Sequence, residues 1–490
     1  MYYKGANGSS EAEMKREIRA EYDQMLMFPP SVEDWIGEEH PARFIRDFVE
    51  SLDLRELGFA VPVSEVGGPF YAPDLLLKVW LYGYMHRIRS TRRLEQACRE
   101  HMGLIWLTGR NVPDHNSLCR FFGTNRKAIS QLFKQSVKVA VKCEMVGMAI
   151  HAVDGTKIRS NSSWNKMVSA EALERMQEKL DRSVSDFMTE IERQEQEEIG
   201  EHKLPSAMHG TLRRKGKIQK ALRELEESEL NRVHHCEPEA RLMKNRRNVD
   251  LSYNAQAAAD KDNGIIVAAD VVNDGSDNGQ LVPMLDQVKE NLGGTAKENL
   301  ADGGYFSGSQ IGLAEEREYE VLLSPPSSET TPSQSSKTHV YHTREFAYDE
   351  ARDCCICPHG EELPYLTTKV RGKNKNAFRV YRCRKHRHCP YRSECTTSKQ
   401  GREVEISVNH RAIERQRAKR EDPANKRLLS QRKAIIEPVF AWIKRHMGFT
   451  RWTVYGLEGV RAQWSLICAT INLSKIYKRW QSGGLRLAIQ

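Results

Sequence analysis

The feature that most constrains the fold is a change of hydrophobic periodicity after residue 145. Over residues 41–145, apolar side chains recur at helical spacing. Residues 148–153 then form a short continuous apolar run, which predicts a buried strand that ends on Asp154. Strand patterns return at residues 251–259 and 264–272, joined by the turn sequence DKDNG. The chain is therefore expected to be an α/β protein in which an all-helical part precedes strands alternating with helices.

Composition argues against several classes of protein. The 490 residues are 39% hydrophobic and 29% charged, which suits about three domains with buried cores. The longest apolar runs are shorter than the roughly 20 residues of a membrane helix, and the first residues hold no apolar segment of signal-peptide type. We therefore expect a cytoplasmic protein with no membrane partner. The formal net charge of +9 permits a polyanionic partner without requiring one.

The helical part is expected to form a domain over residues 29–145, after a disordered arm at residues 1–28. Two short helices separated by a glycine-containing turn in this part are compatible with a helix-turn-helix DNA-binding domain. Arg92 and Arg93 in the first of these helices would suit DNA phosphates. A plain helical packing domain explains the same pattern, so both interpretations stay open.

Three acidic residues form a candidate catalytic set. Asp154 and Asp302 each follow a strand pattern and precede a glycine, whereas Glu437 lies in a helical pattern two turns before Lys444. Phosphodiester chemistry uses such carboxylates to hold two divalent cations, one for the attacking hydroxyl and one for the leaving oxygen. Each of the three residues also has a plain explanation as a cap, a turn residue or an exposed helical side chain. Asp270 also ends a strand pattern and is the alternative to Asp302 as the second carboxylate.

Several short segments occur in an order that resembles a known family. The first half contains HPARFIRDFVESLDL, YAPDLLLKVWLYGY and PDHNSLCRFF. The second half contains DGTKI at Asp154, YNAQAAAD at Tyr253, NDGSDNGQLVPML at Asn273, ADGGYFS at Ala301 and R-x4-E-P-V-F-x3-K at Arg432. This order resembles the DDE transposases of bacterial insertion sequences, specifically the IS-four superfamily and its eleven-eighty-two branch, over residues 27–477.

The resemblance implies an RNase H-like catalytic domain, with a mixed sheet and flanking helices, over residues 146–480. It assigns catalysis and the binding of Mg²⁺, for which Mn²⁺ can substitute, to Asp154, Asp302 and Glu437. Arg432 and Lys444 match the family signature around the glutamate and are expected to bind DNA. The tyrosine of that signature is replaced here by Leu429, which puts contacts with the transposon end in question more than metal binding.

The function that the resemblance implies is that of a DNA transposase. Such an enzyme binds the terminal inverted repeats of its element and cleaves a phosphodiester bond at each end. It then joins the freed 3′-hydroxyls to target DNA by two-metal-ion transesterification, without a covalent protein–DNA intermediate. The expected partners are double-stranded DNA and a second copy of the chain, at the bacterial nucleoid. The alternatives are a catalytically inactive zinc- and DNA-binding regulator and a simple metal-dependent nuclease.

A cysteine-rich segment lies within an expected insertion at residues 325–409, which begins with a Ser/Pro-rich linker. Six of the 11 cysteines fall between Cys354 and Cys395, and in a chain without a signal segment this clustering indicates metal rather than disulfides. We expect a structural Zn²⁺ site, with free thiols in a segment without metal as the alternative. The candidate ligands are Cys357, Cys383, His386, Cys389 and Cys395. Cys383 would replace His386 if the histidine does not ligate.

Basic residues concentrate in the same segment. Between residues 367 and 393 there are ten Lys and Arg residues and no Asp or Glu. Counterion release from DNA phosphates would use such a stripe, whereas a solvated face is the ordinary explanation of a charge run. The candidate DNA-binding residues of this stripe are Arg371, Lys373 and Lys375.

Three smaller predictions complete the outline. Residues 165–235 are expected to form an inserted, highly charged helical hairpin, in which a run of acidic residues is followed by a run of basic residues and the charges are most simply a solvated face. Residues 481–490 are expected to form a tail. Asp277 is expected to cap the helix that follows the third strand pattern.

Overall fold

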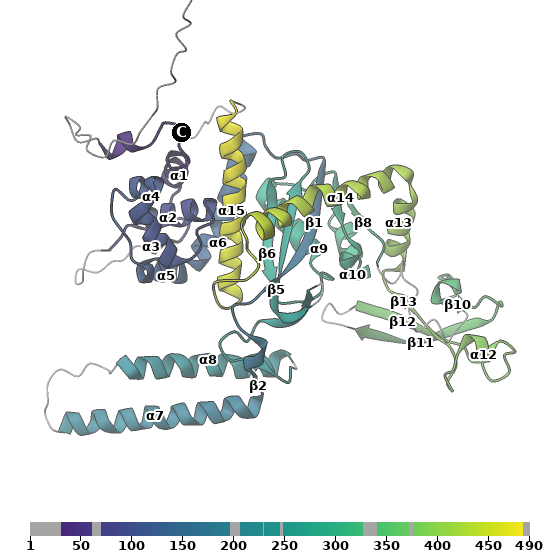
Figure 1. Ribbon diagram of the computed structural model, residues 1–490. Coiled ribbons are helices and arrows are strands. Elements are labelled where there is room, and N and C mark those ends of the chain that lie inside the picture. The colour runs from purple at the N-terminus through teal and green to yellow at the C-terminus, as the bar shows by residue number, and fades with distance from the viewer. Residues whose placement is uncertain are drawn as a thin grey trace, which may run out of the picture.

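The centre of the molecule is a mixed six-stranded sheet. The computed structural model describes residues 31–60, 70–196, 206–228, 230–245, 248–326, 341–371 and 376–483 (Figure 1). The strand order is β4-β5-β1-β7-β8, and β6 also pairs with β5. The strands are β1 (Ile150–Arg159), β4 (Arg241–Asn245), β5 (Asn248–Asp260), β6 (Ile266–Val272), β7 (Glu298–Ala301) and β8 (Val321–Leu323). The predicted mixed α/β class with a helical N-terminal part is confirmed.

Antiparallel and parallel pairing meet at the central strand β1. Strand β5 is antiparallel to β1, β4 and β6, whereas β1, β7 and β8 are mutually parallel neighbours. Parallel strands need a crossover connection, and helix α9 (Leu281–Leu292) lies in the one that leads from β6 to β7. Helix α10 (Gly308–Glu316), preceded by the short turn η3 (Gly303–Tyr305), serves the same purpose between β7 and β8.

Three C-terminal helices complete the part of the fold that contains this sheet: α13 (His410–Glu421), α14 (Pro423–Ala441) and α15 (Leu457–Gln481). In Figure 1, α14 crosses the sheet and α15 stands between the sheet and the N-terminal helices. Asn472 on α15 satisfies the backbone of β6, because its Oδ1 accepts from the Ile266 amide at 2.9 Å and its Nδ2 donates to the Ile266 carbonyl at 2.8 Å. The buried helix thereby supplies the partner that a neighbouring strand would otherwise provide.

The N-terminal helices share one apolar core with the sheet. This core runs from Ile36 in the helical part to Ile476 on α15. It contains buried side chains of the N-terminal helices, of the sheet and of α15. Gln463 on α15 also donates to the Tyr84 hydroxyl at 2.7 Å, which adds a buried polar link. The elements of this part are η1 (Val32–Trp35), α1 (Pro41–Glu50), α2 (Pro73–Met85), α3 (Thr91–Glu100), α4 (Met102–Leu107), α5 (His115–Thr124) and α6 (Arg126–Lys142).

Two excursions from the sheet carry small cores of their own. The first is a helical hairpin of α7 (Ala170–Gln196) and α8 (Ser206–Ser228), closed at its base by η2 (Trp164–Lys166), β2 (Met167–Val168) and β3 (Val233–His234). The second, at the opposite side of Figure 1, contains η5 (Thr343–Glu345), α12 (Arg392–Cys395) and a five-stranded sheet. The strands of that sheet are β9 (Ala347–Asp349), β10 (Cys354–Ile356), β11 (Glu362–Arg371), β12 (Asn376–Arg382) and β13 (Glu403–Ser407).

The structure corrects two local predictions. Strand β1 does not end at Asp154 but continues to Arg159, because its pairing with β5 continues that far. Asp277 does not cap α9, whose N-cap residue is Gln280. Helix α14 runs through Pro438 to Ala441 and then widens into the π turn η6 (Trp442–His446), a local irregularity that is often found at functional sites.

The predictions for the two ends of the chain fall mostly on residues that the structure does not describe. The predicted arm at residues 1–28 and residues 484–490 of the predicted tail lie outside the described residues. Among the residues that the structure describes, none of the helices combines the length and the apolar character needed to cross a membrane.

Candidate active site and nucleic-acid interface

Asp154 and Asp302 lie side by side on adjacent parallel strands. In the pairing of β1 with β7, Ala152 is opposite Leu300. The same register carried two residues further brings Asp154 level with Asp302, immediately after β7 ends at Ala301. The first two residues of the predicted catalytic set are therefore neighbours in space, although they are 148 positions apart in the sequence.

The electrostatics of Asp154 reflect this neighbour. Burial and the charge of Asp302 raise the pKa of Asp154 to about 6, and Arg432 opposes that rise. Nη1 of Arg432 donates to Oδ2 of Asp154 at 3.0 Å, and the Gly155 amide donates to Oδ1 at 2.8 Å. The Arg432 side chain is only 9% exposed, so this ion pair is held away from solvent. Two carboxylates and one buried guanidinium thus form the centre of the site.

Helix α14 is fastened to β1 on both sides of Glu437. Arg432 binds Asp154, and Lys444 in η6 donates to the hydroxyl of Thr156. Asp154 and Thr156 are two residues apart in a strand and therefore project to the same face of the sheet. The Glu437 side chain is exposed. Among the residues that the structure describes, the carboxylate oxygens of Asp154, Asp302 and Glu437 do not form a group in which all three lie within 4.8 Å of one another.

A polar network that the sequence analysis did not assign to the site lies against the two aspartates. Nδ2 of Asn254 and Nε2 of Gln256, both on β5, donate to the same Oδ1 of Asp277 at 2.7 Å. The Tyr305 hydroxyl donates to Oε1 of Gln256. The segments YNAQ and SDNG, used above only for the family resemblance, were the available signal. Asp277 is therefore part of the site's surroundings rather than a helix cap.

Asp270, the alternative second carboxylate, lies elsewhere. It is on β6, opposite Gln256 of β5, and so is separated from β1 by a strand. Its Oδ1 pairs with Nε of Arg461 on α15 at 3.0 Å. Burial raises the pKa of Asp270, and Arg461 opposes this. This position favours Asp302 as the partner of Asp154.

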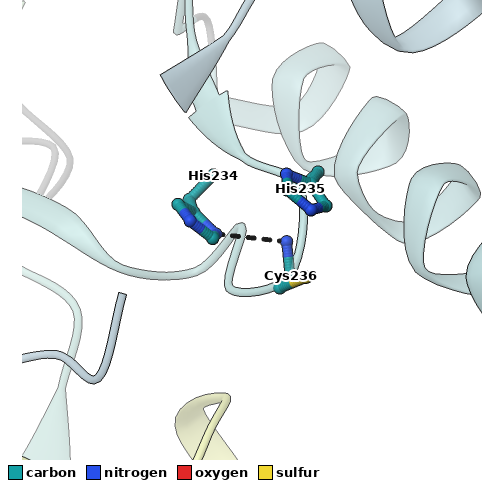
Figure 2. Close-up of side chains that lie close together, drawn as sticks. All are labelled: His234, His235 and Cys236. Atoms are coloured by element: carbon teal, nitrogen blue, oxygen red, sulfur yellow. Dashed lines mark hydrogen bonds between the residues drawn. The ribbon is translucent and has the colours of Figure 1, made fainter. Parts of the chain in front are cut away.

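A second group with metal-ligand chemistry lies at the base of the helical hairpin (Figure 2). His234, His235 and Cys236 follow one another at the end of β3, and their ligand atoms all lie within 4.8 Å of one another. Burial lowers the pKa of His234 to about 4 and also lowers that of His235, so both imidazoles are neutral near pH 7. Neutral imidazole and thiolate suit borderline metals such as Zn²⁺. However, the Cys236 amide donates to Nδ1 of His234 at 3.2 Å, so that nitrogen already has a partner.

The predicted zinc ligands are only partly brought together. Burial raises the pKa of the Cys395 thiol, Arg402 lowers it, and the nearby thiols of Cys383, Cys389 and Cys357 raise it. Among the described residues no three of their sulfur atoms lie within 4.8 Å of one another.

His386 is oriented differently from these cysteines. Its Nδ1 lies 3.2 Å from the Cys383 carbonyl oxygen and its Nε2 lies 3.1 Å from the Lys399 carbonyl oxygen. Both ring nitrogens are thus directed at backbone carbonyls. This orientation favours Cys383 over His386 as a member of the predicted zinc-ligand set.

Acidic residues from a later strand reach the basic stripe. Nη2 of Arg371 donates to Glu405 at 2.6 Å, and Lys369 pairs with Glu403 at 3.1 Å. Both glutamates lie on β13, which follows the stripe in the sequence and pairs with β12. The charge of this surface is therefore lower than the sequence stretch predicts. Lys373 and Lys375 lie outside the described residues.

A cavity of about 550 Å³ lies between the N-terminal helices and the segment after η6, and four arginines line it: Arg87, Arg89, Arg93 and Arg451. Arg89 donates to the Gly448 carbonyl at 3.3 Å, which connects the two parts. Arg93 of the predicted DNA-binding pair thus faces this cavity, and Arg92 is exposed on α3. Such a concentration of guanidinium groups suits an anionic ligand.

Comparison with known proteins first defines the class. A family model described as a transposase domain matches residues 30–124, the N-terminal helices. A second, described as a transposase DDE domain, matches residues 356–477, which contain Arg432, Glu437 and Lys444 but neither Asp154 nor Asp302. Curated proteins and solved structures gave no match.

These two matches indicate, more particularly, a transposase of the DDE type. They suggest a metal-dependent enzyme that cleaves DNA. The order of the two matches along the chain, helical part first and glutamate-bearing part last, agrees with the resemblance found in the sequence.

Proposed function

We propose that the chain is a DNA transposase that binds the terminal inverted repeats of its element, cleaves at the element ends and joins the 3′-hydroxyls to target DNA. The observation that carries the proposal is the pair Asp154 and Asp302, brought side by side by the parallel strands β1 and β7, with Asp154 held by Arg432. The motifs also support a place in the IS-four superfamily and its eleven-eighty-two branch. A mixed sheet with helices around it supports an RNase H-like catalytic domain.

The donor set fits Mg²⁺ or Mn²⁺. Burial and Asp302 raise the pKa of Asp154, which means that the two carboxylates repel each other in the absence of a cation. Oxygen ligands of this kind are those that hard divalent cations prefer. Asp154 and Asp302 would hold the cations, with Glu437 supplied by α14. When bound, the cations would lower the barrier of phosphodiester cleavage by stabilising the attacking and leaving oxygens.

The residues of this chain would position the DNA around that centre. Arg432 orients the Asp154 carboxylate through its hydrogen bond, and its buried side chain keeps solvent from that side. Lys444 binds Thr156 on the same face of the sheet. Its ammonium group would therefore lie near a phosphate that approaches Asp154. Arg92, Arg93 and the arginine-lined cavity would contact more distant phosphates, together with Arg371, Lys373 and Lys375.

Two further assignments belong to the same proposal. Cys357, Cys383, Cys389 and Cys395 would hold a structural Zn²⁺ that stabilises a segment with a small core, with His386 outside the ligand set. A homodimer would bring two transposon ends together on DNA, in the bacterial cytoplasm at the nucleoid.

The test compares cleavage of uncut ends with joining of pre-cut ends. The substrates are DNA duplexes that carry the imperfect inverted repeats from the sequence flanking the gene, and the reactions contain Mg²⁺ or Mn²⁺. Joined product supports the proposal. Nicking without joining would instead identify a metal-dependent nuclease. Binding without either reaction would identify a regulator.

A further inference from the structure

The acidic side chain of Asp277 lies between the two motifs that carry Asp154 and Asp302. It belongs to the connection between β6 and α9, 123 residues after Asp154 and 25 residues before Asp302. Its Oδ1 accepts two hydrogen bonds at 2.7 Å, one from Asn254 and one from Gln256. Two donors on one carboxylate oxygen fix the orientation of the group.

The glycines of the two motifs make room for this carboxylate. A Cβ on Gly155, next to Asp154, would lie 2.5 Å from Oδ1 of Asp277. A Cβ on Gly304, two residues after Asp302, would lie 3.5 Å from Oδ2 of Asp277 and 2.9 Å from Oδ1 of Asp302. Asp277 therefore packs against the backbone of both motifs. At Gly155 this close approach requires glycine, because the Cβ of any larger residue would displace the Asp277 carboxylate or the Gln256 amide, which it would meet at 2.4 Å.

A buried tyrosine ties the same groups together. The Tyr305 hydroxyl donates to Gln256, the residue that in turn donates to Asp277. Burial raises the pKa of Tyr305, and the charges of Asp277, Asp154 and Asp302 raise it further. All three carboxylates are thus near enough to this phenol to act on it electrostatically, as is Arg432, which lowers its pKa. A chain of contacts runs from the turn after Asp302 through Tyr305, Gln256 and Asp277 to the backbone at Gly155.

We propose that Asp277 is a positioning residue of the active site, which sets the spacing of Asp154 and Asp302 and adds a third negative charge beside the divalent cations. This inference rests on the proposed function. Since Oδ1 is occupied by two amides, the contribution of Asp277 is to hold the backbone of the two motifs rather than to react with DNA. Residues that orient metal-binding carboxylates in this way typically change metal affinity or activity by about 10–100-fold when they are replaced.

The experiment measures Mn²⁺ binding by full-length protein with and without Asp277→Asn. Mn²⁺ prefers oxygen ligands, so it reports on the carboxylates rather than on cysteine or histidine groups. Free Mn²⁺ is followed by electron paramagnetic resonance, and thermal unfolding is measured on the same samples. Asp154→Asn serves as the variant that loses a direct ligand. Asp274→Asn is the matched control, because Asp274 lies in the same connection and, within the part of the chain that the structure describes, accepts a hydrogen bond from the Ser276 amide at 3.1 Å rather than from β5.

We expect Asp277→Asn to weaken Mn²⁺ binding about tenfold or more and to shift the Mn²⁺ dependence of cleavage to higher concentration, with partial rescue at excess Mn²⁺. Asp274→Asn should leave both properties unchanged. A variant that lowers the melting temperature without moving Mn²⁺ affinity would show a merely structural role and overturn the inference.

Asn254→Ala provides a second route if Asp277→Asn does not fold. It removes one of the two donors and leaves Gln256 in place, so a smaller loss of Mn²⁺ affinity in the same direction is expected. Unchanged Mn²⁺ affinity in both variants overturns the inference while leaving the proposed function intact. If the wild-type protein neither binds Mn²⁺ nor cleaves DNA, the proposed function and the inference fail together.

Discussion

Nη1 of Arg432 lies 3.0 Å from Oδ2 of Asp154, so a strand and a helix that are 278 residues apart in the chain meet at one carboxylate. This contact places α14 over the face of β1 that carries the candidate active site. Together with the contact between Lys444 and Thr156, it fastens this helical segment to β1 on both sides of Glu437.

Replacing Arg432 by glutamine should lower the rate of cleavage far more than the affinity for DNA. The substitution removes a buried charge beside the reacting centre, where loss of one fixed donor typically reduces kcat by about 10²–10³. Single-turnover cleavage and a binding titration on the same DNA give the two quantities. Arg427→Gln is the control, since Arg427 is exposed on the same helix. Equal losses of rate and affinity would mean that Arg432 only binds DNA.

Asp154→Asn and Asp302→Asn should each abolish cleavage and leave DNA binding nearly intact. Each removes a charged oxygen ligand and no DNA-contacting cation. Asp270→Asn should keep cleavage, because Asp270 is engaged with Arg461 on α15. Gel-based cleavage and mobility-shift assays decide the matter. Normal cleavage by Asp302→Asn together with loss in Asp270→Asn would reverse the assignment of the second carboxylate.

Purified protein should contain about one zinc per chain, and the double substitution of Cys389 and Cys395 by serine should remove it. Serine is a poor ligand for zinc, and the small core around these cysteines offers little other support. Elemental analysis measures the content. Cys236→Ser is the control for the His234–His235–Cys236 group. Zinc that disappears with Cys236→Ser and survives the double substitution would place the metal at the helical hairpin instead.

Glu405→Gln should strengthen binding to DNA. The substitution releases Arg371, which Glu405 now binds at 2.6 Å, and it removes one negative charge from the basic surface. The slope of log affinity against log salt should become steeper by up to about 0.9 for one added phosphate contact. Fluorescence anisotropy at several salt concentrations measures both quantities. Unchanged affinity and slope would indicate that the surface around β11 is only a solvated face.

The N-terminal helices should lose stability in mild acid through His86. Burial, followed by the charges of His101 and His40, lowers the pKa of His86 from 6.5 to about 4. The stability that this histidine supports is present above pH 6.5 and is lost as the pH falls toward 4, because the unfolded chain takes up the proton first.

His86→Phe should flatten this pH dependence, since phenylalanine keeps a ring against Tyr82, where the two centroids are 4.1 Å apart. Melting temperatures between pH 7 and pH 4 provide the measurement. His209→Phe, on the exposed surface of α8, is the matched control. An identical pH profile for His86→Phe and wild type would remove His86 as the cause.

Much of the fold could be predicted locally. The strand β7, the helical pattern of the N-terminal part and the helices on both sides of residues 197–205 depend on periodicities that span fewer than about 30 residues. Short motifs likewise identified Asp154, Asp302 and Glu437 as the candidate set, because each motif is contiguous in sequence. What the motifs lacked was any measure of how the three carboxylates would be placed relative to one another.

Only the tertiary structure decided the surroundings of these residues. The sequence predicts that Asp277 caps a helix and that Arg371 lies in a basic stretch without acids, yet Asp277 binds β5 and Arg371 binds β13. The partner of Asp277 is on β5, which is separated from it by β6. The partner of Arg371 is on β13, which lies beyond the basic stretch of residues 367–393. Pairing register and sheet order, which bring such segments together, are set by burial of the whole apolar core rather than by any local pattern.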